Sequence, residues 1–221
     1  MIKKIFRYAY RNFYSKIFHK TIFANYETEL KRAILSYKSL LNVGCGANSQ
    51  VQSFSKKTYS IGVDAFKPSI EKSKKAGIHN KYYLANVMDI GKKFKENSFD
   101  VVLASDLIEH LKKKEGCKLI RMMEKIAKKR VIIFTPNGFL PQKKFENNDW
   151  QIHKSGWTAK EMKKKGYKII GINGWEALRG EMTEIKFWPK PFWDIVSDFT
   201  RPLTRKFPKY AAQILCVKYL K

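Results

Sequence analysis

A short apolar run followed by a glycine turn reads Ser39-Leu40-Leu41-Asn42-Val43-Gly44-Cys45-Gly46-Ala47-Asn48. The run has the length and apolar content of a buried strand, and the two glycines after it let the main chain approach a ligand closely. The next run of this kind, residues 59–64, ends on Asp64, 18 residues after Gly46. Nucleotide-binding β-α-β units place an acid at about this distance, where its carboxylate accepts hydrogen bonds from ribose hydroxyls. The turn has neither the third glycine nor the lysine of a phosphate-binding P-loop, which argues against ATP hydrolysis.

Outward from this turn, β-branched or aromatic runs alternate with polar or amphipathic segments. The runs predict strands at 39–43, 59–64, 82–87, 99–105, 130–136, 167–173 and 213–220. Between them, helices are expected from Pro68 to Gly77, over about 107–128, and from Thr158, with Glu161 as its capping partner. This alternation is typical of an α/β fold with a mostly parallel sheet covered by helices.

Composition fits one folded domain of a cytoplasmic protein. The chain has 221 residues, of which 44% are hydrophobic, so it can build a substantial core. Its three cysteines (Cys45, Cys117 and Cys216) are odd in number and widely spaced, which predicts reduced thiols rather than a disulfide framework or a zinc site. No apolar stretch is long enough to span a bilayer, and the N-terminus lacks the continuous apolar core of a signal peptide.

The chain is strongly basic, with 45 Lys and Arg residues against 19 Asp and Glu and a formal net charge of +26. Such a charge suggests nucleic acid or an anionic membrane as a partner. However, the charge is spread along the whole chain, and Lys outnumbers Arg by 37 to 8, whereas bidentate recognition of phosphate favours Arg. A binding surface and a lysine-rich composition therefore both stay open as explanations.

Residues 1–24 lie outside the strand and helix alternation. Their sequence puts apolar side chains on one helical face and basic ones opposite, namely Ile2, Ile5, Phe6, Ala9, Phe13 and Ile17 against Lys3, Lys4, Arg7 and Arg11. The segment is predicted to be a helix that either lies on a membrane surface or docks on the domain and closes its site.

Residues 175–210 also fall outside the alternation, because they combine eight aromatic residues with four prolines. Proline at this density argues against a long regular helix or a central strand. The segment is predicted either to cover the pocket or to pack on the surface without a function.

These motifs, in this order, resemble those of the class I S-adenosylmethionine-dependent methyltransferases, and in particular the type 11-like methyltransferase domain. The resemblance covers roughly residues 38–175. It implies a Rossmann-like, seven-stranded, mostly parallel sheet with helices on both faces and an antiparallel last strand. One domain, 1–221, would then consist of a basic helical extension (1–37), a donor-binding core (38–174), an aromatic and proline-rich insertion (175–210) and the last strand (211–221).

The resemblance also implies the residues that bind the donor. The turn 42–48 resembles the motif that cradles the methionine part, Asp64 the ribose-binding acid, 85–90 the adenine-contacting motif, and 97–105 and 132–137 the fourth and fifth strands. The donor-binding residues would be Asn42, Gly44, Cys45, Gly46, Asp64, Ala65, Asn86, Val87 and Ser105.

Three asparagines depart from the family pattern: Asn42 and Asn86 stand where acids are usual, and Asn48 where a third glycine is common. The amide of Asn86 can still accept a hydrogen bond from the adenine amine through its carbonyl oxygen. The departures predict weaker donor binding, and a methyltransferase-like module that binds without catalysis is the alternative.

Candidate catalytic residues follow the fourth and fifth strands. On a helix, Asp106 and His110 would be four residues apart and face one side together with Glu109, and the later loop adds His153. In one interpretation, His153 or Asp106 acts as a general base beside His110. In another, Glu109, His110 and His153 bind a divalent metal together with Asp106. This set resembles the metal motif of small-RNA 3′-terminal 2′-O-methyltransferases and of some quinone-biosynthesis O-methyltransferases, with Asp106 replacing a Glu. In the third interpretation, Glu109 and His110 have no catalytic role and only cap and pack a helix.

The stretch from Thr135 to Arg179 resembles methyltransferases encoded near glycan and lipid biosynthesis genes. We therefore expect O-methylation of a sugar, glycolipid or other small hydroxylated acceptor, with peripheral contact to the anionic inner face of the membrane through the basic N-terminus. RNA 2′-O-methylation is the alternative function, suggested by the charge and by the Asp106, Glu109, His110 and His153 set. No oligomeric state follows from the sequence.

Overall fold

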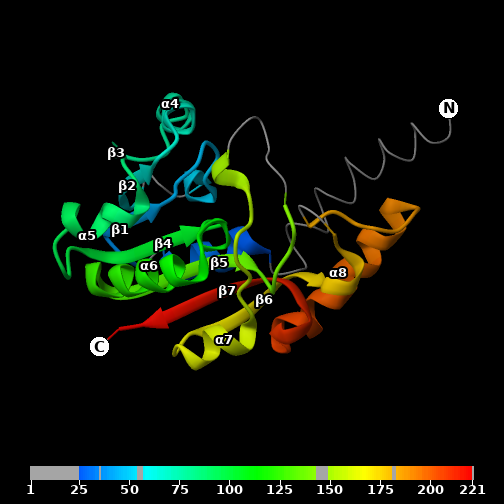
Figure 1. Ribbon diagram of the computed structural model, residues 1–221. Coiled ribbons are helices and arrows are strands. Elements are labelled where there is room, and N and C mark those ends of the chain that lie inside the picture. The colour runs from blue at the N-terminus through cyan, green and yellow to red at the C-terminus, as the bar shows by residue number, and fades with distance from the viewer. Residues whose placement is uncertain (1–24, 35, 54–56, 143–148, 181–182, 221) are drawn as a thin grey trace.

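The computed structural model describes residues 25–34, 36–53, 57–142, 149–180 and 183–220. The strands within these ranges form one seven-stranded sheet with the order β3-β2-β1-β4-β5-β7-β6 (Figure 1). The strands are β1 (Ser39–Val43), β2 (Tyr59–Asp64), β3 (Lys81–Leu84), β4 (Phe99–Ser105), β5 (Ala127–Pro136), β6 (Lys168–Trp175) and β7 (Ala211–Tyr219). Strands β1 to β5 pair in parallel, and β7 lies antiparallel between β5 and β6. The predicted seven-stranded, mostly parallel Rossmann-like sheet is confirmed.

Helices cover both faces of this sheet. They are α3 (Tyr26–Ile34), α4 (Lys67–Lys75), α5 (Ile90–Lys93), α6 (Lys113–Ile126), α7 (Ala159–Lys164) and α8 (Lys190–Lys206), with 3₁₀ turns η2 (Gln50–Ser53), η4 (Val87–Asp89), η5 (Ile108–His110), η6 (Asp149–Gln151), η7 (Glu176–Leu178) and η9 (Pro208–Tyr210). Apolar residues of α5, α6 and α7 form one core with side chains such as Val102 and Ile133. On the other face, α3 buries Leu30 and Ile34 against Val101 and Leu103. Alternate residues of β4 thus point into the two cores, as the period of a strand requires.

Three of the predicted strands have the predicted bounds, and Thr158 caps α7 by accepting a hydrogen bond from the Glu161 amide. The third strand is shorter than expected. It ends at Leu84 because Asn86 turns the chain into η4, with its side chain accepting a hydrogen bond from the Met88 amide.

The prediction of one long helix over 107–128 is wrong in its first turns. Asp106 has a φ of 47°, Ile108–His110 form the 3₁₀ turn η5, and Leu111 is extended. The helix α6 begins only at Lys113. The site residues at 106–110 therefore lie in a strand-to-helix connection rather than on one helical face.

The prediction that proline excludes a long helix from 175–210 is also wrong, because α8 has 17 residues. Its first proline caps the helix and the second lies in the first turn, where no amide needs a partner. Among the prolines of α8, only Pro202 lies beyond the first turn. The predicted amphipathic helix at 1–24 lies outside the described residues. Within those that are described, no helix is both long and apolar enough to cross a membrane.

Candidate functional site

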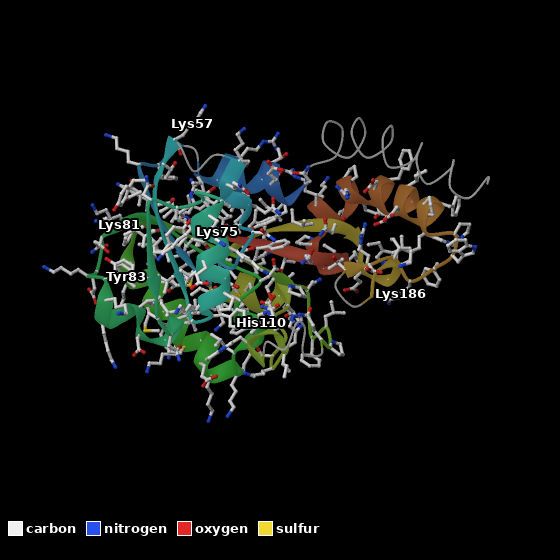
Figure 2. The ribbon with its side chains drawn as sticks, turned by 90° about the horizontal axis from the view of Figure 1, so that it is seen from above. Lys57, Lys75, Lys81, Tyr83, His110 and Lys186 are labelled. Atoms are coloured by element: carbon white, nitrogen blue, oxygen red, sulfur yellow. The ribbon has the colours of Figure 1, made fainter. Side chains whose placement is uncertain are left out.

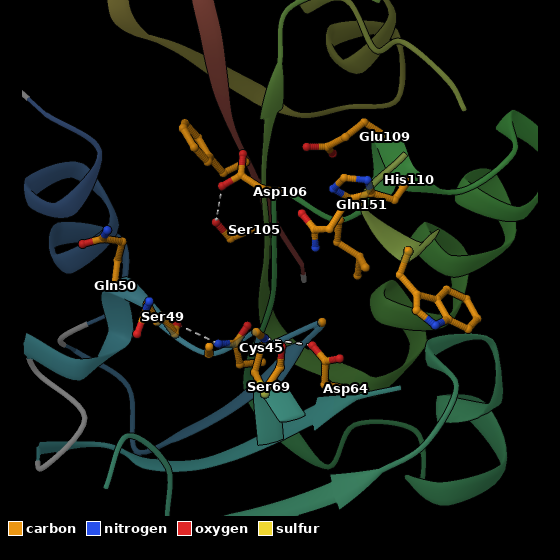
Figure 3. A pocket seen from close by; sticks show the side chains of 18 of the residues that line it. Cys45, Ser49, Gln50, Asp64, Ser69, Ser105, Asp106, Glu109, His110 and Gln151 are labelled. Carbon is orange, nitrogen blue, oxygen red and sulfur yellow. Dashed lines mark hydrogen bonds between the residues drawn. The ribbon is translucent and has the colours of Figure 1, made fainter. Parts of the chain in front are cut away.

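A cavity of about 810 Å³ opens at the carboxyl ends of β1, β2, β4 and β5 (Figure 3). In open α/β sheets this edge is where ligands bind. The cavity is lined by all nine residues predicted to bind the donor, and by Asp106, Glu109, His110 and His153 as well. The fold therefore brings together every candidate site residue named from the sequence.

The glycine turn and Asp64 hold one another in place at one end of the cavity. Gly44 and Gly46 have φ values of 67° and 60°, which side-chain-bearing residues rarely adopt. The Gly46 amide donates to Asp64 Oδ2 at 2.8 Å, and the Phe66 amide donates to Oδ1 at 2.9 Å. The carboxylate is thus oriented by two main-chain amides, with lone pairs left on both oxygens for a ligand.

Asn42 belongs to a neutral hydrogen-bond network behind the turn. Its Nδ2 donates to Ser49 Oγ at 2.9 Å and lies 3.4 Å from His79 Nε2, while His79 Nδ1 lies 3.1 Å from Ser60 Oγ. Burial lowers the pKa of His79 to about 4, so this imidazole stays neutral near pH 7. In the tautomer in which Nδ1 donates to Ser60 Oγ, the lone pair of Nε2 accepts from the Asn42 amide, a hydrogen bond that a carboxylate at position 42 could not donate.

Asp106 lines the cavity and lies near groups from three elements. Ser105 Oγ lies 3.3 Å from its Oδ2, Gln213 Nε2 lies 3.4 Å from its Oδ1, and the Tyr26 hydroxyl donates to Ser105 Oγ at 2.8 Å. The surrounding protein desolvates the carboxylate and raises the pKa of Asp106 to about 7. Neither Tyr26 nor Gln213 was found from the sequence, since they come from α3 and β7, far away along the chain.

Glu109, His110 and His153 form a compact cluster in which one ligand atom from each lies within 4.8 Å of the others. Nδ1 of His110 lies 3.3 Å from the Ile152 carbonyl oxygen, and Nδ1 of His153 lies 2.5 Å from that of Leu140. Both rings then donate through Nδ1, which leaves a lone pair on each Nε2. Burial lowers the pKa of His110 to about 4, with the charge of His153 adding to the effect.

The carboxylate of Glu109 is incompletely hydrogen bonded. Its Oε2 accepts from Thr135 Oγ1 at 2.9 Å, whereas the buried Oε1 accepts no hydrogen bond from the described residues. Burial raises its pKa, and the charge of Asp106 raises it further. Two imidazoles beside a carboxylate oxygen, with one ligand atom from each residue in a compact group, form a donor set that suits a divalent cation. Asp106 lies outside this compact group, so three of the four predicted ligands come together.

A family model described as "Methyltransferase domain" matches residues 41–135, which span β1 to β5 and hold the glycine turn, Asp64 and Asp106. This match confirms, for residues 41–135, the resemblance to the class I S-adenosylmethionine-dependent methyltransferases. The match supports S-adenosylmethionine as the methyl donor that the resemblance implies. A search among curated proteins found no match.

Solved structures show the same fold at low sequence identity. The methyltransferase is similar to a SAM-dependent methyltransferase from Archaeoglobus fulgidus, with a TM-score of 0.58 and 16% identity over 88% of this chain and 92% of that one. It is also similar to the methyltransferase domain of a bacterial Hen1 (TM-score 0.52, 18% identity, 87% of this chain and 94% of that one). A third is phosphoethanolamine N-methyltransferase 2 of Haemonchus contortus, with bound S-adenosyl-L-methionine (TM-score 0.55, 16% identity), where the match covers 87% of this chain and 51% of that one.

Proposed function

We propose that this methyltransferase transfers a methyl group to a hydroxyl of a neutral, hydroxyl-rich acceptor such as a sugar, a glycolipid or a similar small molecule. The observation that carries the proposal is the lining of the cavity. Nine carboxamide side chains line it. Three of them belong to the donor motifs (Asn42, Asn48 and Asn86), and the six outside those motifs are Asn25, Gln50, Gln142, Gln151, Asn173 and Gln213. An amide both donates and accepts hydrogen bonds, which suits hydroxyl groups that do the same.

The charge of the lining also argues for a neutral acceptor. Among the described residues that line the cavity there is no Lys or Arg, although the chain carries 45 of them. Four carboxylates line it instead (Glu27, Asp64, Asp106 and Glu109). A site for a phosphate-rich acceptor needs cations around it, whereas carboxylates suit the positively charged sulfonium of the donor. The half-exposed ring of Trp150 adds a flat apolar surface on which a sugar face can pack.

The donor is assigned to the end of the cavity formed by the glycine turn. The main chain at Gly44, Cys45 and Gly46 would lie against the methionine part, and Asp64 would accept hydrogen bonds from the ribose hydroxyls. Asn42 supports the turn from behind. At the adenine, Ala65, Val87 and Asn86 would form the contact surface, since one lone pair of the Asn86 carbonyl remains beside its bond to Met88. Ser105 would lie between the donor and Asp106.

Methyl transfer is an in-line displacement in which the sulfur–carbon bond breaks as the oxygen–carbon bond forms, and the acceptor hydroxyl loses its proton. Asp106 is the proposed general base. Its raised pKa, about 7, is close to a working pH, so it can take a proton from a hydroxyl and release it afterwards. The products are the methyl ether, S-adenosylhomocysteine and one proton.

Glu109, His110 and His153 are proposed to hold a divalent cation at the acceptor end of the cavity. When bound, such a cation would polarise an acceptor hydroxyl and lower its pKa. The chain's own part is to present the two imidazoles with their lone pairs inward, fixed by the carbonyls of Ile152 and Leu140, and to supply the free oxygen of Glu109.

RNA 2′-O-methylation is the second candidate, favoured by this Glu109, His110 and His153 cluster. The similar fold of a small RNA methyltransferase, HEN1, is consistent with it (TM-score 0.55, 17% identity). The absence of Lys and Arg among the described lining residues favours the neutral acceptor. The two candidates differ in a measurable way, because RNA binding would weaken steeply as salt is raised.

The deciding experiment incubates the purified protein with methyl-labelled S-adenosylmethionine and an extract of its source. Label in the lipid or glycan fraction supports the proposal, and label in nuclease-sensitive material supports the RNA alternative. Any transferred label excludes a module that only binds.

The donor site is tested separately with Asp64→Ala, which we expect to weaken binding of S-adenosylmethionine by about tenfold or more, since it removes hydrogen bonds to a charged group. Unchanged affinity would show that the donor binds elsewhere.

A further inference from the structure

Helix α8 carries its polar side chains inward and its apolar side chains outward. Ser197, Asp198, Arg201 and Thr204 are all buried. On the opposite face, Phe192, Phe199 and Leu203 are 55%, 69% and 59% exposed. These three are spaced by seven and four residues and so form a single stripe along the helix. A helix that packs on an apolar core has the opposite arrangement, with its apolar side chains inward and its polar side chains outward.

The inward face is fixed by specific contacts with β6. A Cβ on Gly171 would meet the Thr204 carbonyl oxygen at 2.1 Å, and one on Gly174 would meet that of Ser197 at 2.4 Å, so the helix main chain lies directly on the strand. Arg179 donates to Ser197 Oγ, and Thr200 Oγ1 accepts from the Trp175 amide at 2.9 Å. Rolling the helix to bury its apolar stripe would break these bonds, so the stripe is a stable surface feature.

Aromatic side chains continue this surface beyond both ends of the helix. Before it, Phe187 and Trp188 are 44% and 72% exposed, and Phe187 contacts Trp193. After it, Phe207 and Tyr210 are each 45% exposed. We call the side chains of Phe187, Trp188, Phe192, Phe199, Leu203, Phe207 and Tyr210 the aromatic surface. Surface apolar groups gathered in this way mark an interaction site.

Cations surround the aromatic surface, while the acids of the segment face inward. Residues 186–210 hold six basic and two acidic side chains. Of the two acids, Asp194 lies 3.8 Å from Arg179 and Asp198 pairs with Arg201 at 2.6 Å. Lys206 and Lys209 lie over the rings of Phe207 and Tyr210, 5.9 and 4.4 Å from the ring centroids. Lys186 lies at the same end of the molecule, opposite Lys57, Lys81 and Tyr83 (Figure 2).

We infer that the aromatic surface docks the methyltransferase onto an anionic lipid bilayer. Half-exposed aromatic rings beside lysines suit the boundary between lipid headgroups and acyl chains, and the cations are attracted to anionic headgroups. A second copy of the chain fits less well, since each copy carries +26 and the same rim of lysines would face itself. The inference goes beyond the proposed function, because lipid binding needs neither donor nor acceptor.

The docking surface also has a direct structural connection to the cavity. Ser197 Oγ donates to the Asn173 carbonyl, and Arg179 donates to the Thr183 carbonyl at 2.8 Å. Both Asn173 and Thr183 line the cavity. The inward face of α8 thus contacts the same segment that lines the cavity.

The test is co-sedimentation of the full chain with vesicles of phosphatidylcholine alone and of phosphatidylcholine with about one-third phosphatidylglycerol. We expect binding to the anionic vesicles, reduced at high salt. The double variant Phe199→Ser and Leu203→Ser should bind about tenfold or more weakly, because two large apolar groups no longer enter the interface. The matched control is Leu84→Ser, since Leu84 is 55% exposed but lies on β3, at the other edge of the sheet.

Three results would overturn the inference. The first is wild-type protein that does not bind anionic vesicles. The second is vesicle binding that survives the double variant but is lost in Phe6→Ser and Phe13→Ser, which would assign the contact to residues 1–24. The third is a dimer, seen by sedimentation velocity without lipid, that the double variant dissociates. Unchanged affinity of the double variant for S-adenosylmethionine would show that the variant is folded. A failure of the lipid-docking inference can therefore be distinguished from a failure of the proposed methyl transfer.

Discussion

The imidazole rings of His110 and His153 lie 4.8 Å apart, centroid to centroid, and cross at 63°. Each ring faces a main-chain carbonyl with its Nδ1, which sets the same tautomer in both. The loop that holds His153 is bound to η5 directly, since the amides of Lys154 and Ser155 both donate to the Glu109 carbonyl, at 2.7 and 3.0 Å. The pair is therefore held rigidly before any ligand arrives.

This arrangement predicts that the protein binds Mn²⁺ or another divalent cation, measured by titration calorimetry. Removing one of three ligands in His153→Ala should weaken binding by about tenfold to hundredfold, in the range seen when a site loses a supporting group. His79→Gln is the control, since His79 is also a buried histidine but belongs to the network behind the glycine turn. If the wild type binds no cation, or the His153→Ala variant binds it equally well, the three side chains have only a packing role.

A second prediction concerns the pH dependence of methyl transfer. A base must be deprotonated to act, and the pKa of Asp106 is raised to about 7 by desolvation, so kcat/KM should rise with pH and level off above about pH 7. Asp106→Asn keeps the size of the side chain but removes the base, and should lower kcat by about 10²-fold to 10⁴-fold and abolish this rise. Glu96→Gln, at an exposed acid outside the cavity, should keep the wild-type profile. An unchanged profile in Asp106→Asn would assign the proton to another group.

The donor end of the site could be predicted from the sequence because its residues are local. The glycines at 44 and 46 and the acid at 64 lie in one β-α-β unit, and the turn geometry follows from the short strand and the glycines. The acceptor end could be predicted only in part. Asp106, Glu109 and His110 were found, but their placement on a helix was wrong, because Asp106 has a positive φ and residues 108–110 form a 3₁₀ turn, neither of which the sequence pattern indicated.

The residues that the sequence did not indicate come from distant parts of the chain. Tyr26 contacts Ser105 across 79 positions of sequence and Gln213 contacts Asp106 across 107, so only the folded domain brings these residues together. The reversed polarity of α8 was missed for a similar reason. Its apolar spacing is that of an ordinary packed helix, and only the glycines of β6 show that the polar face is the one that packs.

A third prediction compares the two glycines of the turn, which share a positive φ but differ in their surroundings. A Cβ on Gly44 would lie 2.7 Å from Leu107 Cδ1, whereas one on Gly46 would meet nothing within 4 Å. Gly46→Ala should therefore cost only the backbone strain, about 1–2 kcal/mol. Gly44→Ala should cost about 1–3 kcal/mol more, because Leu107 must move as well. Urea unfolding of the two variants measures the difference in their free energies of unfolding. Equal losses of this free energy would show that the Leu107 side chain moves aside at little cost.

The last prediction follows from His79, whose pKa falls from 6.5 to about 4 because burial disfavours the charged ring. The unfolded chain takes up this proton near pH 6.5 and the folded protein only near pH 4. The stabilisation is therefore complete above pH 6.5 and is lost as the pH falls from 6.5 towards 4, by on the order of 2–3 kcal/mol.

The measurement is the free energy of unfolding in urea at pH 7.5 and at pH 4.5, for the wild type and for His79→Gln. Because the raised pKa values of Asp106 and Glu109 act in the opposite direction, the informative quantity is the difference between the two proteins at each pH. The wild type should lose more stability on acidification than the variant, since glutamine has no proton to gain. If the two proteins lose equal free energy of unfolding between pH 7.5 and pH 4.5, His79 is already charged in the folded protein at pH 4.5. The network around Asn42 is then not neutral.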